Sequence, residues 1–424
     1  MFRIISSSDA DGVAALLDRR PGRDPRLEAR VARIVARVRE GGDAALLAFA
    51  RKFDRLAGSI EVASAEIEQG VRDTPREVRE ALGLAARHIR RVARKQIPRA
   101  WTVSPVAGVR VEQRVTPLDR VGCYVPGGRY PLPSSLLMTA IPARVAGVRE
   151  ILAVCPRIDP VICAAAREAG VDRLYRVGGA HAIAALAYGT ETIARVDKIV
   201  GPGNAYVAAA KALVADTCAI DFFAGPSEIA VVSDTGRPDW IAADLIAQAE
   251  HDPHARAILI TSSKRLAKDV AREVARQMPA DGPAPVSLAA NGGIIVTRNA
   301  DEAIALGQRL APEHLVCDSD AMAARLTRAG TVFVGDYSAQ ACGDYVTGSN
   351  HVLPTSGAAA ARGGLSAADF VRVSTVQRIT AAGLRRIGPA GVALANAEGL
   401  SAHAASMAVR IAARAAARPR GSQR

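Results

Sequence analysis

The stretch Lys198-Ile199-Val200-Gly201-Pro202-Gly203-Asn204 decides the fold, because it joins a short apolar strand to a predicted helix through a glycine turn. That helix is expected over residues 205–215. The same order of strand, turn and helix repeats in both directions, back to about residue 116 and forward to about residue 336. Alternation of this kind predicts parallel sheets covered by helices on both faces.

Apolar runs bounded by turn residues place the other elements. Strands are predicted at 121–125, 151–154, 173–177, 198–200, 229–232, 257–260, 293–296, 315–316 and 331–334. Helices are predicted near 136–147, 161–169 and 180–188. We therefore expect an α/β fold with two similar Rossmann-like units, both of which lack the GxGxxG fingerprint of dinucleotide-binding folds.

Four segments follow from these patterns, as expected for a chain of 424 residues, which exceeds a single hydrophobic core. Residues 116–226 form the first Rossmann-like unit. Residues 227–365 form the second, in which 337–365 is a Gly-, Ser- and Ala-rich stretch typical of a long functional loop. Residues 1–115 are predicted to be helical, and their later part is expected to pack on 227–336. Residues 366–424 are predicted to form a C-terminal helical segment.

Composition narrows the class of protein. Hydrophobic residues make up 49% of the chain and charged residues 23%, which is ordinary for a globular enzyme. The formal net charge is +13, but the arginines are dispersed and are not interleaved with aromatic residues, so we expect no nucleic-acid partner. Without a signal peptide or an apolar run of transmembrane length, we expect a cytoplasmic protein that does not contact membranes.

A candidate metal site begins at Gln248 and His251, in the segment Gln248-Ala249-Glu250-His251. On a helix, side chains three residues apart leave the same face. An amide oxygen and an imidazole, joined by the distant Asp344 and His403, supply ligand types that zinc accepts. The spacing alone is weak evidence, because most Gln/His pairs three residues apart are simply solvated, and the sequence around these residues makes the interpretation specific.

Candidate proton-transfer and nucleotide-binding residues lie at the ends of predicted elements. Glu313 and His314 follow a helix broken by Pro312, and a carboxylate beside an imidazole suits proton transfer, although an exposed loop pair fits as well. Two glycine turns, Tyr124 to Gly128 and Gly201 to Asn204, follow strands and could form a nucleotide crevice or simple tight turns.

Taken together, these motifs resemble the histidinol dehydrogenase family, whose members catalyse the last two steps of histidine biosynthesis. The motifs stand in the family's order and span nearly the whole chain. They are VGCYVPGG (Val121 to Gly128), GPGN (Gly201 to Asn204), AGPSE (Ala224 to Glu228), QAEH (Gln248 to His251), APEHL (Ala311 to Leu315), GDYVTGSNHVLPT (Gly343 to Thr355) and EGLSAH (Glu398 to His403).

The resemblance implies roles for particular residues. One zinc ion per subunit would be held by Gln248, His251, Asp344 and His403. Glu313 and His314 would transfer protons. L-histidinol would be contacted by Ser227, His314, Glu398 and the four zinc ligands, and NAD by Tyr124, Asn204 and the residue at position 181. The family forms homodimers in which the C-terminal region of one subunit completes the partner's site, so Glu398 and His403 would act in trans.

The chain departs from the family pattern at two places. His181 stands where the family usually has a glutamine that contacts the cofactor, and histidine can still donate and accept hydrogen bonds there. The loop also reads Ser338-Ala339-Gln340 where a Pro-Glu pair is common, outside the residues expected to contact zinc or substrate.

The implied reaction is the oxidation of L-histidinol to L-histidine through histidinal. Because an alcohol must lose two hydrides to become a carboxylate, two NAD+ are used in sequence. One alternative is a related zinc- and NAD-dependent enzyme for another polar alcohol, such as a sulfonated diol. A second is a non-catalytic metal- or nucleotide-binding protein that has kept the fold.

Overall fold

The structure is a computed structural model of the chain, and it describes residues 2–18, 24–128, 130–222 and 225–413. It divides into two compact units. Unit 1 consists of residues 1–97 and 118–370, and unit 2 consists of residues 98–117 and 371–424. Ala224, which opens the AGPSE motif, and the end of the predicted C-terminal segment, 414–424, lie outside the described residues.

Within unit 1, a first lobe is built on a five-stranded sheet in the order β6-β5-β4-β7-β8. All neighbouring strands are parallel. The strands are β4 (Arg120–Tyr124), β5 (Glu150–Val154), β6 (Arg173–Tyr175), β7 (Lys198–Val200) and β8 (Ala219–Ile220). Four of the five residues of β5 are fully buried, as expected for a parallel strand covered on both faces.

Helices cover both faces of this sheet. On one side α5 (Pro133–Ala146) and α6 (Pro160–Ala169) pack together beneath α3 (Ser64–Asp73) and α4 (Arg76–Gln96). On the other side α7 (Gly179–Tyr188) and α8 (Ala205–Val214) pack against each other and against α2 (Pro25–Phe49). The predicted alternation of strands and helices in this part of the chain is confirmed.

A second lobe of unit 1 contains a six-stranded parallel sheet in the order β1-β11-β10-β9-β12-β13. Its strands are β1 (Ile4–Ser6), β9 (Glu228–Val232), β10 (Arg256–Thr261), β11 (Gly293–Val296), β12 (His314–Cys317) and β13 (Thr331–Val334). One face is covered by α9 (Pro238–Ala249), α10 (Lys264–Gln277) and α11 (Pro283–Asn291), the other by α1 (Ala10–Leu17) and α12 (Ala300–Leu310). The short α13 (Asp320–Ala323) precedes β13.

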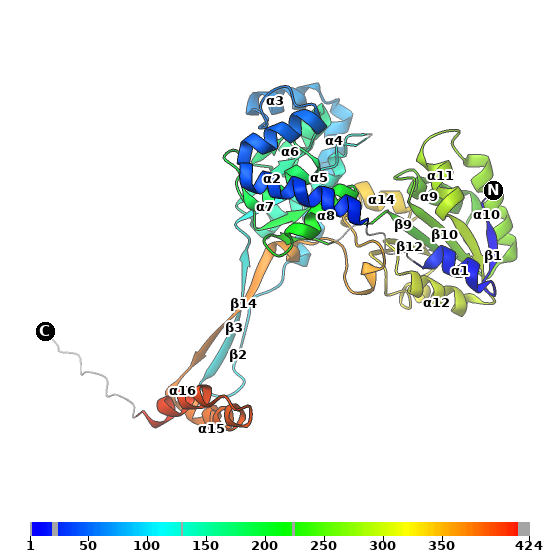
Figure 1. The fold of residues 1–424 in the computed structure, drawn as a ribbon. Coiled ribbons are helices and arrows are strands. Elements are labelled where there is room, and N and C mark those ends of the chain that lie inside the picture. The colour runs from blue at the N-terminus through cyan, green and yellow to red at the C-terminus, as the bar shows by residue number, and fades with distance from the viewer. Residues whose placement is uncertain (1, 19–23, 129, 223–224, 414–424) are drawn as a thin grey trace. The chain divides into compact units, whose positions relative to one another are not determined.

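The N-terminal segment packs differently from our expectation. Its later part, α4, lies on α5 and α6 of the first lobe and not on the 227–336 unit. Instead β1 and α1, at the start of the chain, join the second lobe (Figure 1). Val13, Leu16 and Leu17 are buried there, each contributing roughly 1.5–3 kcal/mol. An apolar stripe shows which face of a helix is buried but not which core receives it, so the sequence did not settle this point.

The predicted functional loop contains short helices. These are α14 (Gln340–Tyr345) and η2 (Ala358–Ala360). A third short helix, η3 (Ala367–Phe370), follows the loop. A buried hydrogen bond of 2.7 Å, from Asn350 Nδ2 to the Met138 carbonyl oxygen, ties the loop to α5 of the first lobe.

Unit 2 is not purely helical, which corrects the predictions for both ends of the chain. It contains an antiparallel sheet of β14 (Val371–Ile379), β3 (Val109–Pro117) and β2 (Trp101–Val103), followed by α15 (Ala381–Ala397) and α16 (Ser401–Ala412). The two helices pack closely, and a Cβ atom on Gly388 would lie 2.6 Å from Ile411 Cδ1. Because β14 is mostly exposed and β3 is mostly half-buried, they lack the buried apolar runs by which the other strands were predicted.

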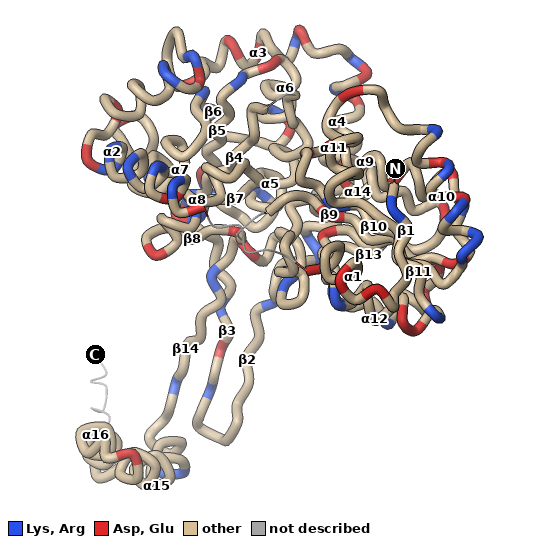
Figure 2. The backbone as a smooth tube through the Cα atoms, turned by 45° about the vertical axis from the view of Figure 1, so that its right-hand side comes forward, with Lys and Arg blue, Asp and Glu red and all other residues tan. Residues whose placement is uncertain are grey.

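Charged residues of both signs are intermixed along the backbone of the described residues (Figure 2). Among the same residues, every helix is too short or too polar to span a lipid bilayer.

Candidate active site

A buried polar cluster lies at the amino-terminal edge of the second lobe's sheet. Ser227 immediately precedes β9, and Glu313 immediately precedes β12. The two strands are neighbours, with His314 in register with Ile229. The strand order also reverses between β9 and β12: β10 lies next to β9 on one side, and β13 lies next to β12 on the other.

Glu313 is a buried carboxyl group with a raised pKa. Its Oε2 accepts a hydrogen bond of 3.0 Å from the backbone N–H of Glu228. Burial raises the pKa to about 7, although the neighbouring His314 opposes the shift. A carboxyl group that titrates near neutral pH can take up and release protons during a catalytic cycle.

His314 lies between two carboxylates. Its Nδ1 is 3.8 Å from Glu313 Oε2, and its Nε2 is 3.5 Å from Asp344 Oδ1. Burial disfavours the charged ring, but the carboxylates of Glu313 and Asp344 outweigh it and raise the pKa of His314. Within the described part of the chain, Nδ1 is buried without a hydrogen-bond partner, so this atom is free to meet a ligand.

His251 and Asp344 come together beside this pair, and α9, which carries Gln248, contacts α14, which carries Asp344. Gln248 is fully buried, and neither amide atom has a hydrogen-bond partner in the described ranges. His251 Nε2 lies 4.0 Å from Asp344 Oδ2. Helix α9 ends at Ala249, so the predicted helix carries Gln248 but not His251, whose N–H still donates to the Gln248 carbonyl oxygen over 3.4 Å.

These three donors fit part of a zinc site. A buried amide without partners is costly unless a ligand satisfies it, and amide oxygen, imidazole nitrogen and carboxylate oxygen are all atoms that bind zinc. The residues that the structure describes contain no group of three or more His, Cys, Asp or Glu arranged to hold a metal ion. The predicted fourth ligand, His403, and the predicted substrate residue Glu398 lie in unit 2, and both are exposed.

A second candidate region lies at the carboxyl edge of the first lobe's sheet. Tyr124 ends β4 and Gly201 follows β7, and the strand order reverses between these neighbours. Open α/β sheets bind nucleotides at such switch points. Only glycine fits at Gly201, because φ is +117° and a Cβ atom would lie 2.2 Å from the Tyr124 carbonyl oxygen. Asn204 is exposed and caps α8 by accepting from the N–H groups of Tyr206 and Val207.

Tyr124 and His181 are both buried next to the turn at Gly178 and Gly179. The Tyr124 hydroxyl accepts a hydrogen bond of 3.1 Å from the Gly179 N–H, and burial raises its pKa to about 12, so it stays neutral. His181 is 2% exposed, and its Nε2 is 2.7 Å from Asp54 Oδ2. The His181 ring packs with Phe49 and Phe53, at centroid distances of 5.9 and 6.1 Å.

Sequence reasoning missed the groups that hold the glycine turns. Asp54, at the end of the π-helix η1 (Ala50–Asp54), also accepts a hydrogen bond of 3.0 Å from the Gly178 N–H. The buried pair Lys211 and Asp221 clamps Gly201, whose carbonyl oxygen accepts from Lys211 and whose N–H donates to Asp221. Neither contact has a sequence signal, since isolated acidic and basic residues are usually solvated.

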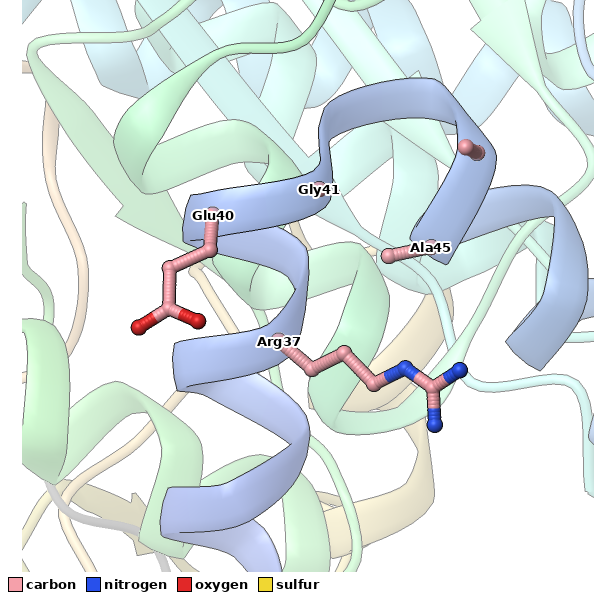
Figure 3. A pocket seen from close by; sticks show the side chains of 5 residues that line it. Arg37, Glu40, Gly41 and Ala45 are labelled. Atoms are coloured by element: carbon pink, nitrogen blue, oxygen red, sulfur yellow. The ribbon is translucent and has the colours of Figure 1, made fainter.

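A separate hollow of about 340 Å³ lies on α2 and carries no evident chemistry (Figure 3). Its charged side chains, Arg37 and Glu40, extend away from each other, and the rest of its lining is Gly41, Ala44 and Ala45. It shares no residue with the polar cluster.

Two parallel α/β lobes, one with glycine turns at a switch point and one with a buried acid–base pair, define an enzyme of the dehydrogenase type. A family model described as histidinol dehydrogenase matches residues 17–411. The chain therefore belongs to the histidinol dehydrogenase family and is an NAD-dependent oxidoreductase.

Relatives match the chain over nearly its whole length. Histidinol dehydrogenase of Bradyrhizobium diazoefficiens is 47% identical and covers 96% of this chain and 98% of its own. That of Caulobacter vibrioides is also 47% identical, over 94% of this chain and 95% of its own. The crystal structure of histidinol dehydrogenase from Elizabethkingia anophelis matches with a TM-score of 0.92 at 33% identity, covering 97% and 98% of the two chains. These findings do not favour the alternative of an enzyme for another polar alcohol.

Proposed function

We propose that this enzyme oxidises L-histidinol to L-histidine through histidinal, using two NAD+ and one zinc ion per subunit. The observation that carries the proposal is the convergence of the acid–base pair Glu313 and His314 with the unsatisfied amide of Gln248 and with Asp344 and His251. These residues come from three separate parts of the chain, 248–251, 313–314 and 344.

The zinc ligands are Gln248, His251, Asp344 and the partner subunit's His403. Bound there, zinc would hold the amino and imidazole nitrogens of the substrate and so orient its carbinol carbon. Ser227, next to Glu313 at the same sheet edge, and Glu398 contribute polar contacts to the substrate.

His314 is the base in both oxidation steps. In the first, Nδ1 accepts the hydroxyl proton while the carbinol hydride leaves to NAD+, because Nε2 already faces Asp344. Glu313 then takes a proton from water as the water oxygen adds to the histidinal carbonyl carbon, and His314 returns its proton to the carbonyl oxygen, which gives the hydrate and leaves His314 neutral again. One Glu313 oxygen is occupied by the Glu228 N–H, so Oε1 is the atom that meets water. The second hydride leaves from this hydrate, whose hydroxyl proton passes to His314.

NAD occupies the switch point of the first lobe. Tyr124 contacts it from the end of β4 and Asn204 from the N-terminus of α8, whose positive dipole end favours the phosphates. His181 acts at this site together with Asp54, whose carboxylate is hydrogen-bonded both to the His181 ring and to the Gly178 N–H.

The enzyme is a homodimer in which unit 2 of one subunit completes the site of the other. Unit 2 exposes large apolar side chains, including Trp101, Val373, Leu394 and Val409, of which Leu394 and Val409 are 65% and 64% exposed. Apolar surface of this extent on a small unit favours burial against a partner. His403 and Glu398 lie on the same unit, exposed and ready to be shared.

Counting cofactor against substrate tests the proposal. We expect two NADH for each L-histidinol consumed, loss of activity after zinc is removed with a chelator, and recovery when zinc is restored. Short polyols at the same concentration serve as the control and should give no NADH. One NADH per histidinol, or full turnover by metal-free enzyme, would contradict the proposal.

A further inference from the structure

Gln340 is a buried amide in the first turn of α14 with a single evident task. It is 1% exposed, and its Nε2 donates a hydrogen bond of 2.8 Å to Asp344 Oδ2, one helical turn later. Asp344 is itself only 7% exposed. Pairs at this spacing are common on solvated helix faces, but here both members are withdrawn from water, so the hydrogen bond is well shielded.

The oxygen that Gln340 contacts is also the one that faces His251. Asp344 Oδ2 lies 4.0 Å from His251 Nε2, whereas Oδ1 lies 3.5 Å from His314 Nε2. The main chain of Asp344 is fixed separately, by a contact of 2.8 Å between its carbonyl oxygen and His351 Nδ1. Gln340 therefore sets the rotation of the carboxylate about its last bond.

An amide suits this task for two reasons. A carboxylate oxygen has two lone pairs, so Oδ2 can accept from Gln340 and still bind a cation. The amide also orients the carboxylate without changing the charge around it, unlike a lysine or a second carboxylate. Groups that orient metal ligands in this way typically alter metal affinity by roughly 10- to 100-fold when removed.

We propose that Gln340 is a positioning residue for Asp344, which it holds toward His251 so that the two residues can share a zinc ion. This inference rests on the proposed function, which assigns Asp344 and His251 to zinc. It gives a role to a position that, on sequence grounds, lies outside the residues that contact zinc or substrate.

The decisive measurement is zinc affinity, by competition with a chelator of known affinity. Gln340→Leu keeps the size and removes the donor, and should weaken zinc binding by roughly 10- to 100-fold. Gln340→Asn keeps an amide but withdraws it by one methylene, and should shift affinity in the same direction. Absorption spectra of the Co²⁺-substituted variants should change as well, because they report the geometry of the ligands.

Two controls separate the possible outcomes. Gln69→Leu, on α3 of the first lobe, removes an amide that donates a hydrogen bond of 2.7 Å to Asp73 Oδ1 at the same spacing but at an exposed position, and should leave zinc affinity unchanged. Wild-type zinc affinity in folded Gln340→Leu and Gln340→Asn would overturn the positioning role. Wild-type affinity in Asp344→Asn would instead overturn the ligand assignment, and with it that part of the proposed function.

Discussion

Burial of the Glu313 carboxyl group brings its pKa into the range useful for proton transfer, but it also makes the ionised form unfavourable. This carboxyl group is buried beside His314 and receives one backbone hydrogen bond, so the folded protein holds its proton up to a pH of about 7. In the unfolded chain the same group ionises near its ordinary value of 4.5. Between these pH values the unfolded state binds fewer protons than the folded state, so stability falls as pH rises.

The cost of this arrangement is measurable. A shift from 4.5 to about 7 corresponds to roughly 3 kcal/mol, absent below pH 4.5 and fully developed above pH 7. Glu313→Gln cannot ionise and should therefore raise the Tm at pH 8, by several degrees, while changing it little at pH 4.5. Thermal unfolding at the two pH values checks this. A variant that is less stable than wild type at pH 8 would show that the carboxylate is stabilising.

The same variant should lose activity in one step more than in the other. If Glu313 activates water, Glu313→Gln slows the oxidation of histidinal more than that of histidinol, and single-turnover measurements with each substrate compare the two. Equal slowing of both steps would refute this division of labour between Glu313 and His314.

At the scale of elements, the first turn of α7 depends on a residue from another helix. Gly178, at its N-terminal cap position, has no side chain, and Asp54 accepts hydrogen bonds from the Gly178 N–H and from His181. Hydrogen bonds to a charged group contribute about 1.5–3 kcal/mol each. The turn that faces the proposed cofactor is thus stabilised by Asp54 of η1, and not by a side chain of its own N-cap residue, Gly178.

Weakening this link should affect the cofactor more than the chemistry. Asp54→Asn should raise the Kd for NADH by about tenfold, the lower end of what one charged hydrogen bond contributes, and lower kcat much less. NADH fluorescence titration measures the first quantity and steady-state rates the second. Asp43→Asn is a matched control, because Asp43 bonds to Thr192 and not to the α7 turn. Unchanged NADH affinity in folded Asp54→Asn would contradict the role of Asp54.

Elements with strong periodic patterns were predictable, and the exceptions have physical reasons. The strands that form the centres of the two parallel sheets were predicted from buried apolar runs, and β5 and β9 illustrate this. The half-buried β3 and the mostly exposed β14 carry no such pattern, and the two-residue β8 is too short to show one. Tertiary contacts without a local signal were also missed, such as the pair Asp54 and His181, which are 127 positions apart.

The candidate site was predictable to a similar degree. The family motifs brought Gln248, His251, Glu313, His314 and Asp344 into one list, and distances of 3.5–4.0 Å join the last four, while Gln248 lies buried three residues before His251 and its role stays a prediction. The role of Gln340 could not be predicted, because it depends on which carboxylate oxygen faces which neighbour. Glu398 and His403 remain predictions, since they lie in unit 2.

At the scale of the whole molecule, sharing of His403 between subunits can be tested by complementation. His251→Asn and His403→Asn should each be inactive alone. If the partner lends His403, a mixed dimer contains one intact site. That site combines His251 of the His403→Asn subunit with His403 of the His251→Asn subunit. Co-expression followed by activity assay should recover about half the activity of wild type per mixed dimer. No recovery, with mixed dimers shown to form, would mean that each chain uses its own His403.

The pairing of β3 with β14 constrains the order in which the chain can fold. Arg378 and Glu112, which form an ion pair across these strands, are 266 positions apart. During synthesis β3 emerges long before its partner strand exists, so the sheet of unit 2 can close only after residues 371–379 have been made. A prematurely terminated chain would thus leave an unpaired strand edge, with its backbone hydrogen-bonding groups open to aggregation.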